Sequence, residues 1–126
     1  MPISKIFLLK GRSSEFKRKV LDIVHQSLVT SIHKPQDDRR QMIFEFDSEH
    51  FEFGGRSEQF LFIEINLLKG RSAEAKRNLF KLMVDQLHFE LSIPKNDITI
   101  MLNEQELGNW GIHGGNPASD FEWKFV

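Results

Sequence analysis

The chain has 126 residues, of which 40% are hydrophobic, and its formal net charge is −1. This length fits one compact domain, residues 1–126, with enough apolar side chains for a core. Because acids and bases are interspersed, we expect no nucleic-acid binding that relies on phosphate attraction. The lack of cysteine excludes disulfides and thiolate chemistry. No apolar run approaches the length of a membrane span and residues 1–5 do not resemble a signal peptide, so we expect a cytoplasmic protein without membrane association.

The first elements along the chain are a strand, a helix and a second strand. Residues 3–9 are rich in branched and aromatic side chains, which predicts a strand. Ser13 is placed to cap a helix, and Glu15 suits the first helical turn. Apolar residues then recur at helical spacing on one face, as expected of a helix that lies on a sheet. After a loop that contains Pro35, residues 41–46 predict the second strand.

The strongest internal signal is a repeat. Leu-Leu-Lys-Gly-Arg-Ser at residues 8–13 returns at residues 67–72, and about a third of the positions in the same register are identical. We interpret this as a tandem duplication of one supersecondary unit. Repeat one spans about residues 2–58, repeat two about residues 59–107, and a tail covers residues 108–126.

The second repeat has the same layout, and the two together predict the fold. We expect strands at residues 60–68 and 98–102 on either side of a helix capped by Ser72. A strand–helix–strand crossover gives a parallel pair. Two such units related by pseudo-twofold symmetry predict an α/β (α+β) fold, a four-stranded mixed sheet with two helices on one face. The other face would stay apolar and uncovered, which predicts an obligate oligomer.

The linker and the tail carry weaker signals. Residues 48–57 predict a short strand and a turn between the repeats. Residues 108–118 are rich in Gly, Asn and Pro, which favours loops. The strict alternation of residues 120–125 predicts a final edge strand.

This layout resembles the tautomerase superfamily, which shares the fold of macrophage migration inhibitory factor. Its βαβ building block begins with proline and occurs twice in fused members. Pro2 follows a removable Met1 and stands where the family has its nucleophile or base. The Leu-Lys-Gly-Arg-Ser strings fall where the family has a strand-to-helix turn with an anion-binding arginine. Residues 109–119 look like the C-terminal signature of the branch related to malonate semialdehyde decarboxylase.

The chemistry that the resemblance assigns to Pro2 follows from its amine. Once Met1 is removed, Pro2 exposes a secondary amine, and a free α-amino group has a pKa of roughly 7.7–8.0. In an apolar pocket this pKa would fall, and the amine would act as a general base. Near a carboxylate such as Asp38 the pKa would rise, and the cationic amine would act as a general acid. An iminium with a carbonyl compound is a third route.

The second Leu-Lys-Gly-Arg-Ser string supplies the predicted anion site. Arg71 is suited to holding a substrate carboxylate in a two-pronged, charge-assisted bond, with Lys69 as an assistant. The decarboxylase has two arginines flanking a proline here, so Lys69 and Gly70 depart from that pattern. The alternative is that both cations are solvated turn residues. Since Leu61 repeats Pro2 without a free amine, we expect one site per chain.

Four further residues complete the predicted site. Asp38 matches the aspartate that the decarboxylase uses with its proline, although its repeat partner Asp97 has no amine to serve and suggests a loop role for both. Trp110, Ile112 and Phe121 would form an apolar wall that excludes water, or would pack the tail against a neighbouring subunit. The five histidines show no metal-ligand spacing, so we expect no metal and no cofactor.

These observations predict a cofactor-independent keto–enol tautomerase. It would act on a small 2-oxo acid through Pro2 and Asp38 and assemble as a homotrimer. One alternative is a decarboxylase or hydratase like malonate semialdehyde decarboxylase. The other is a non-catalytic binding protein on the same fold.

Overall fold

The computed structural model describes residues 2–126, so the expected removal of Met1 lies outside the described residues. The main elements are β1 (Ile3–Leu9), α1 (Ser14–Ile32), β2 (Gln41–Phe46), β3 (Leu61–Leu68), α2 (Ala73–Leu91) and β4 (Ile98–Gln105). Both predicted caps are confirmed. The hydroxyl oxygens of Ser13 and Ser72 accept the backbone N–H groups of Phe16 at 3.0 Å and Ala75 at 3.1 Å. Each cap satisfies a free donor of the first helical turn.

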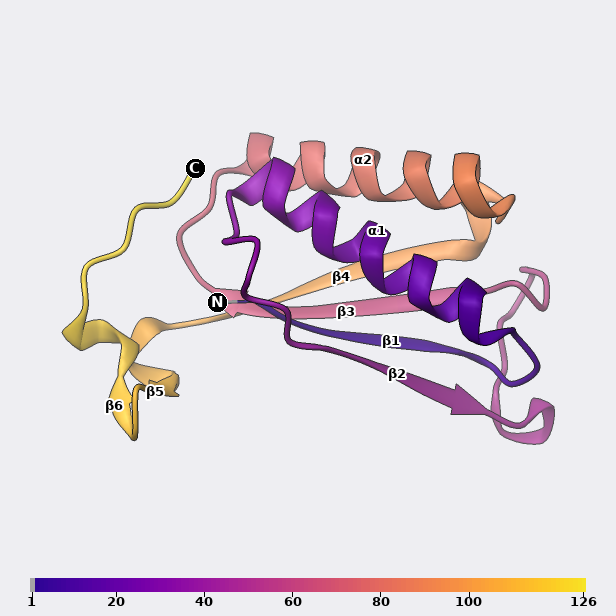
Figure 1. Cartoon of the computed structure of the whole chain (residues 1–126), viewed down its shortest axis with the longest axis horizontal. Helices are drawn as coiled ribbons and strands as arrows, with labels where there is room; N and C mark the ends of the chain where they lie inside the picture. The colour runs from indigo at the N-terminus through magenta and orange to yellow at the C-terminus, as the bar shows by residue number, and fades with distance from the viewer. Residues whose placement is uncertain (1) are drawn as a thin grey trace.

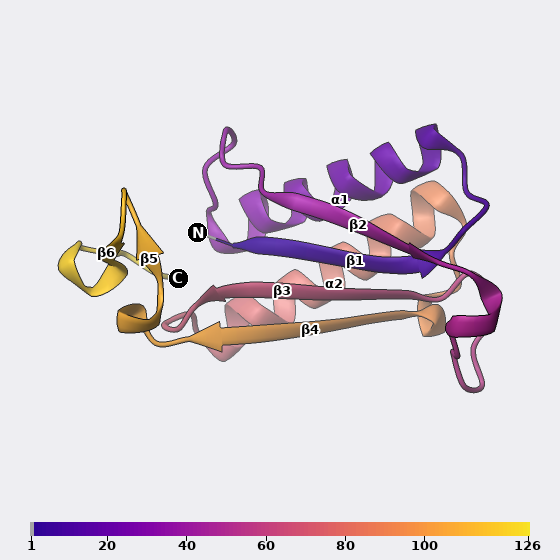
Figure 2. The ribbon, with the colours of Figure 1, turned by 90° about the horizontal axis from the view of Figure 1, so that it is seen from below.

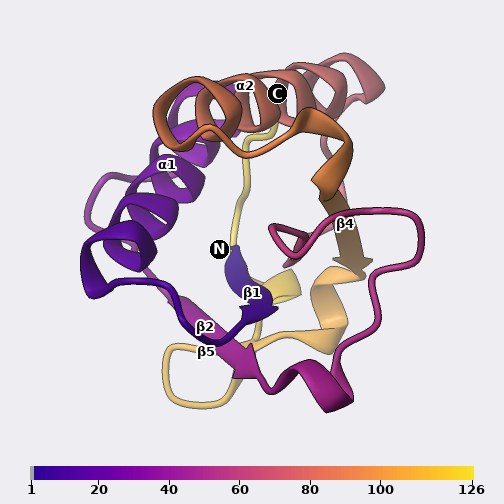
Figure 3. The ribbon, with the colours of Figure 1, turned by 90° about the vertical axis from the view of Figure 1, so that its right-hand side faces the viewer.

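The four strands form one mixed sheet in the order β2-β1-β3-β4. Each repeat contributes a parallel pair, and the two repeats meet where β1 and β3 run antiparallel. Figures 1 and 3 show both helices on the same side of the sheet, as the repeat predicted. None of the helices within residues 2–126 is long and apolar enough to cross a membrane.

The core lies between the helices and the covered face of the sheet. Alternate residues of the two central strands point into it, and the fully buried apolar ones among them are Ile6, Leu61, Ile63, Ile65 and Leu67. The helices supply the opposing layer, which includes Val20, Val24, Leu28, Leu79, Met83 and Leu87. Burying this apolar surface is what holds each amphipathic helix on the sheet.

The open face of the sheet, seen in Figure 2, is divided into two halves. Phe7 of β1 stacks on Phe44 of β2 and on Phe62 of β3, with ring centroids 5.0 and 5.5 Å apart. Towards β4 the face is mixed: the Asn103 side chain donates to that of Asn66 at 2.8 Å, and Met101 on the same face is exposed. The predicted apolar open face is therefore confirmed only over its aromatic half.

Two local strand predictions were wrong. The linker contains a short 3-10 helix at Ser48–His50 and then irregular chain, with no strand at residues 51–57. The tail forms a two-residue hairpin, β5 (Gly111–Ile112) with β6 (Asn116–Pro117), and residues 121–126 form no edge strand. This last segment, which we call the tail strap, binds the N-terminal end of α2 instead of a sheet edge: the Ser72 N–H donates to the Val126 carbonyl oxygen at 2.9 Å.

Candidate active site

The start of repeat one lies beside the turn of repeat two. In the antiparallel pairing of β1 and β3, Ile3 faces Asn66. Continuing this register by one residue sets Pro2 opposite Leu67, just before the Lys69–Arg71 turn. Pro2 is buried. In Figures 1 and 2 the N-terminus lies at the end of the sheet that carries the β5–β6 hairpin.

Arg71 folds back towards the end of β3. Its Nη1 donates to the Leu68 carbonyl oxygen at 2.9 Å, and its guanidinium lies over the Phe125 ring at 4.5 Å. Its Nε is buried without a hydrogen-bond partner among residues 2–126. Burial lowers the pKa of Arg71, and the nearby Glu104 carboxylate opposes part of this shift. The guanidinium therefore keeps an unpaired donor, Nε, in a sheltered place, which suits a carboxylate.

The tail strap covers this turn. Gly70 has φ +143°, and a Cβ placed there would overlap the Phe125 ring. Trp123 stacks parallel to Phe125 with centroids 6.2 Å apart, and its Nε1 donates to the Ala118 carbonyl at 2.8 Å. Sequence reasoning missed Phe125 and Trp123. Their signal is the aromatic alternation at the end of the chain, which by itself predicts a strand.

Only part of the predicted apolar wall lies near the Arg71 turn. Ile112 belongs to a small buried cluster with Leu68, against which Trp110 packs. Phe121 does not join that cluster; it is 38% exposed and meets His113 edge-on at 4.8 Å. Trp110 and Ile112 are thus close to the residue that anchors Arg71, whereas Phe121 lies apart.

Lys69 is not directed at the same place. Its side chain is 62% exposed, and its Nζ pairs with Glu106 Oε1 at 2.8 Å. The hydrogen bond and charge of Glu106 raise the pKa of Lys69. Such an exposed pair contributes little to stability, so a ligand would separate it at small cost.

Asp38 lies in the loop between α1 and β2. Its two oxygens accept Arg40 Nε at 2.9 Å and Nη2 at 3.2 Å. The Arg40 carbonyl in turn accepts the Ser4 N–H at 3.0 Å, so this ion pair lies near the start of β1. Sequence reasoning missed Arg40. The available signal was a cation two residues after a carboxylate in extended chain, where both side chains point the same way.

The repeat partner of Asp38 has a different role. Asp97 is buried and accepts the backbone N–H of Ser57 at 3.1 Å and also the Ser57 hydroxyl. It anchors the linker between the repeats. The loop role that the repeat suggested therefore holds for Asp97. Asp38 instead pairs with Arg40, close to the N-terminal end of β1.

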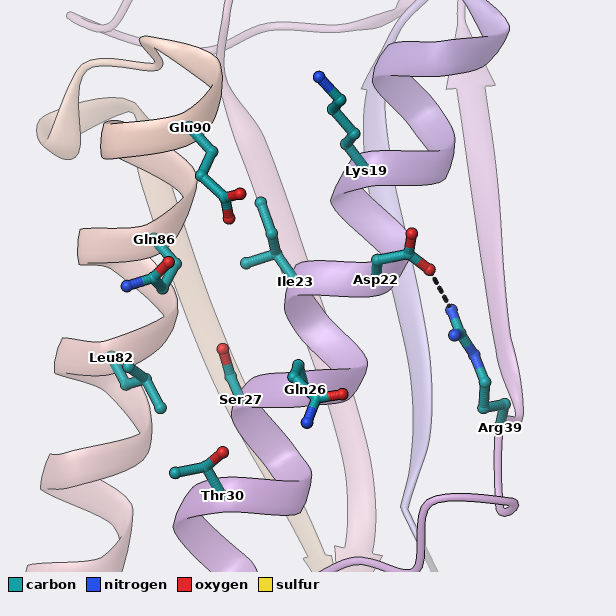
Figure 4. A pocket seen from close by; sticks show the side chains of 10 residues that line it. All are labelled: Lys19, Asp22, Ile23, Gln26, Ser27, Thr30, Arg39, Leu82, Gln86 and Glu90. Atoms are coloured by element: carbon teal, nitrogen blue, oxygen red, sulfur yellow. Dashed lines mark hydrogen bonds and ion pairs between the residues drawn. The ribbon is translucent and has the colours of Figure 1, made fainter.

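A groove of about 610 Å³ lies elsewhere, between α1 and α2. Its lining includes none of the predicted site residues. Figure 4 shows its mixed lining, with Arg39 bonded to Asp22 at 2.8 Å. Among residues 2–126, no group of three or more histidine or acidic side chains is placed to hold a metal ion.

Comparisons with known proteins agree with this architecture. Two family models, each described as tautomerase enzyme, match residues 2–60 and 38–113. The probable tautomerase YusQ of Bacillus subtilis (strain 168) is 29% identical over 121 residues, which is 91% of this chain and 95% of YusQ. The 2-hydroxymuconate tautomerase of Stutzerimonas stutzeri is 37% identical over 57 residues, 45% of this chain and 90% of that one.

Solved structures show the same fold. Native fused 4-OT has a TM-score of 0.84 at 25% identity and covers 94% of this chain and 97% of its own. FG41 malonate semialdehyde decarboxylase inhibited by 3-bromopropiolate has a TM-score of 0.80 at 27% identity, covering 93% and 92%. The chain belongs to the tautomerase family, and its two βαβ units make it a fused member.

Proposed function

We propose that this protein is a cofactor-independent keto–enol tautomerase that acts on a small 2-oxo acid through the amine of Pro2. The observation that carries the proposal is the antiparallel pairing of β1 with β3, because it brings the start of one repeat next to the Arg71 turn of the other. The 2-hydroxymuconate tautomerase relatives support a substrate of this kind, an enol that carries a carboxylate.

In the proposed reaction, the neutral Pro2 nitrogen accepts the proton of the enol hydroxyl. The electron pair of the O–H bond forms the carbonyl, and the double bond supplies the pair for a new C–H bond. Pro2 then returns a proton to that carbon, so atoms and charge balance without a co-reactant. A base with a pKa near the working pH serves both transfers best.

Arg71 binds the substrate carboxylate in this proposal, with Lys69 as a second cation when it leaves Glu106. Trp110 and Ile112 keep water from the reacting carbon, and Phe121 would join them only by a change in the tail. Asp38 orients a water molecule, whose O–H groups it can accept. A partly buried guanidinium whose Nε has no partner among residues 2–126 favours a carboxylate over a neutral ligand.

The decarboxylase-like alternative is favoured by Asp38, since a carboxylate beside Pro2 would keep the amine cationic. The pairing of Asp38 with Arg40 argues against this alternative, because Arg40 already binds both Asp38 oxygens. The lysine and glycine at positions 69 and 70 are a second argument against it, since lysine lacks the planar fork of arginine.

We propose a homotrimer, with its copies in contact through the open face of the sheet. Trimers of fused 4-OT proteins with this fold support the assembly. The aromatic half of the face offers apolar surface that a second copy would cover. A cytoplasmic location is part of the same proposal.

Intact-protein mass followed by an assay on the same sample tests the proposal. The mass shows whether Met1 has been removed, and the assay follows ketonisation of phenylpyruvate enol. We expect turnover by processed protein and a loss of about 10²- to 10⁴-fold in Pro2→Ala, because the ring no longer fixes the nitrogen. Chains that retain Met1 should contribute nothing, since their Pro2 nitrogen is an amide. Processed protein that is inactive, or equally active without the proline, would instead favour a binding protein.

A further inference from the structure

Four side chains of repeat one each have a buried polar atom that lacks a partner in the described part of the chain. The atoms Ser4 Oγ, His25 Nδ1, Lys34 Nζ and Gln41 Oε1 are buried and have no hydrogen-bond partner among residues 2–126. Buried polar atoms are usually paired, so each of these needs an explanation. We call these four residues the polar cluster.

The polar cluster lies between α1 and the sheet. Ser4 and Gln41 are paired neighbours on β1 and β2, and Gln41 Nε2 reaches up to the Leu21 carbonyl of α1 at 2.9 Å. His25 is one turn further along this helix, and Lys34 follows the end of the helix. Burial lowers the pKa of His25, and the charge of Lys34 lowers it further, so the two side chains are close in electrostatic terms.

The second repeat shows that the fold does not require this polarity. At the repeat offset of about 59 residues, the cluster positions become Ile63, Val84, Ile93 and Ile100. All four belong to the apolar core or pack against it. The same architecture therefore accepts hydrocarbon at every one of these positions, and repeat one has polar groups there for another reason.

The position that distinguishes repeat one is Pro2, which Leu61 replaces in repeat two. Pro2 and Ser4 are both buried and alternate on the same face of β1. The Ser4 N–H donates to Arg40 at the end of the α1–β2 loop, and Figures 1 and 2 both show this loop passing beside the N-terminus. Ser4, and with it the α1–β2 loop that carries Lys34, therefore lies next to the proposed catalytic amine.

Lys34 gives this place an unbalanced positive charge. From its own loop it is influenced by Asp38, Arg39 and Arg40, and of these Asp38 alone favours its charge. Both Asp38 oxygens are already held by Arg40. On α1, His25 is a group whose pKa the charge of Lys34 lowers.

The protonation states of the cluster follow from burial and hydrogen bonding. The His25 Nε2 pairs with the Gln36 amide oxygen at 3.2 Å, which makes Nε2 the donor and leaves Nδ1 a bare acceptor in a neutral ring. Burial lowers the pKa of Lys34 to about 8, so this lysine is still mostly charged at neutral pH. A positive charge disfavours a second one nearby.

We propose that Lys34 is a positioning residue for Pro2, and that its buried ammonium keeps the neighbouring N-terminal amine uncharged and able to accept a proton. The inference rests on the proposed function, because it concerns the amine that serves as the base there. It also separates the tautomerase from the decarboxylase-like alternative, in which the amine would be cationic.

An NMR titration of ¹⁵N-proline-labelled, Met1-free protein tests this without requiring turnover. Only Pro2 among the four prolines carries an amine that titrates. We expect its titration midpoint to rise by about one pH unit in Lys34→Met, because a like charge is removed. Lys34→Arg keeps the charge and should retain the wild-type midpoint. Lys10→Met is the matched control, since Lys10 is an exposed lysine paired with Asp47.

A midpoint that stays in place or falls in Lys34→Met overturns the role of Lys34. If that variant does not fold, Lys34→Ile supplies the residue that repeat two has at Ile93, and the same shift is expected. The acid limb of the kcat/KM profile should move together with the midpoint. An inactive wild type with a shifted Lys34→Met midpoint would overturn the proposed function and leave the Lys34 inference standing.

Discussion

The two Lys-Gly-Arg turns have the same sequence and different surroundings. In repeat one, Arg12 lies over Phe16 of its own helix at 4.2 Å, nothing approaches the Cβ position of Gly11, and the turn borders an open hollow of about 370 Å³. In repeat two, the tail strap covers Gly70, and Arg71 lies under Phe125. The tail follows repeat two only, so identical residues became a solvated turn in one place and a sheltered cation in the other.

The cores of the two repeats also differ, and here repeat one has the unusual residues. Repeat one is polar at Ser4 and Lys34, where repeat two has buried isoleucine. The sheltered arginine and the polar cluster therefore lie in different repeats, and the antiparallel β1–β3 contact brings them to the same end of the sheet. Differences between the repeats, more than their identities, indicate where function lies.

The largest expected effect is a difference in kcat/KM between variants of Arg71 and of Arg12. Arg71→Ala removes the sheltered guanidinium and should lower kcat/KM by about 10- to 100-fold, mainly through KM, as expected for a charge-assisted bond to the substrate carboxylate. Arg12→Ala should leave the kinetics unchanged. Steady-state assays of both variants measure the difference. Equal losses of kcat/KM would contradict different roles for the two turns.

A stability measurement should show that the buried charge of Lys34 lowers the free energy of unfolding. Its pKa is about 8 in the folded chain against 10.5 for an ordinary lysine, so the unfolded chain binds the proton more tightly between these pH values. Stability should therefore rise with pH across that window, and the cost is fully present below pH 8. We expect Lys34→Met to raise the free energy of unfolding at pH 7 by about 2–3 kcal/mol, with a smaller gain above pH 10.

Urea unfolding at the two pH values makes this comparison, with Lys10→Met as the control. Lys10 is exposed, so its variant should change little at either pH. A Lys34→Met protein that is less stable than the wild type at pH 7 would mean that the ammonium supports the fold.

The smallest effect concerns the two glycines. Gly11 and Gly70 both have positive φ, so alanine strains either turn. Only at Gly70 would the new Cβ also meet Phe125, and we expect Gly70→Ala to cost about 1 kcal/mol more than Gly11→Ala.

Thermal unfolding of a double-mutant cycle with Phe125→Ala isolates this contact. The extra cost of Gly70→Ala should disappear when the ring is absent. If the extra destabilisation by Gly70→Ala persists in the Phe125→Ala background, it does not come from a contact with the Phe125 ring.

Much of the fold could be predicted because local signals agreed with one another. The strand of residues 3–9 and the strand of residues 41–46 have the predicted bounds, and both serine caps form. The tail could not be predicted. Alternation of Phe121, Trp123 and Phe125 indicates an extended segment, but which surface it contacts depends on Gly70 and Ser72, which are far away in the sequence.

The sequence also predicted part of the geometry of the candidate site. Pseudo-symmetry predicts that the start of repeat one lies beside the turn of repeat two, and the pairing of β1 with β3 has this arrangement. The pairing of Lys69 with Glu106, the engagement of Asp38 by Arg40 and the outward position of Phe121 depend on side-chain packing. The polar cluster had a sequence signal, since polar residues in repeat one replace apolar residues in repeat two, but only the structure shows that their polar atoms are buried without a partner within residues 2–126.

The central claim is that the amine of repeat one and the arginine of repeat two form one site. An alkynyl 2-oxo acid tests it directly, because a neutral amine adds to its electron-poor triple bond, forming a C–N bond while the amine proton passes to the adjacent carbon. Mass spectrometry of Met1-free protein should find one probe per chain, on the peptide that begins with Pro2, with slower labelling in Arg71→Ala and an unchanged rate in Arg12→Ala. A probe on another residue, or labelling that ignores Arg71, would contradict the account.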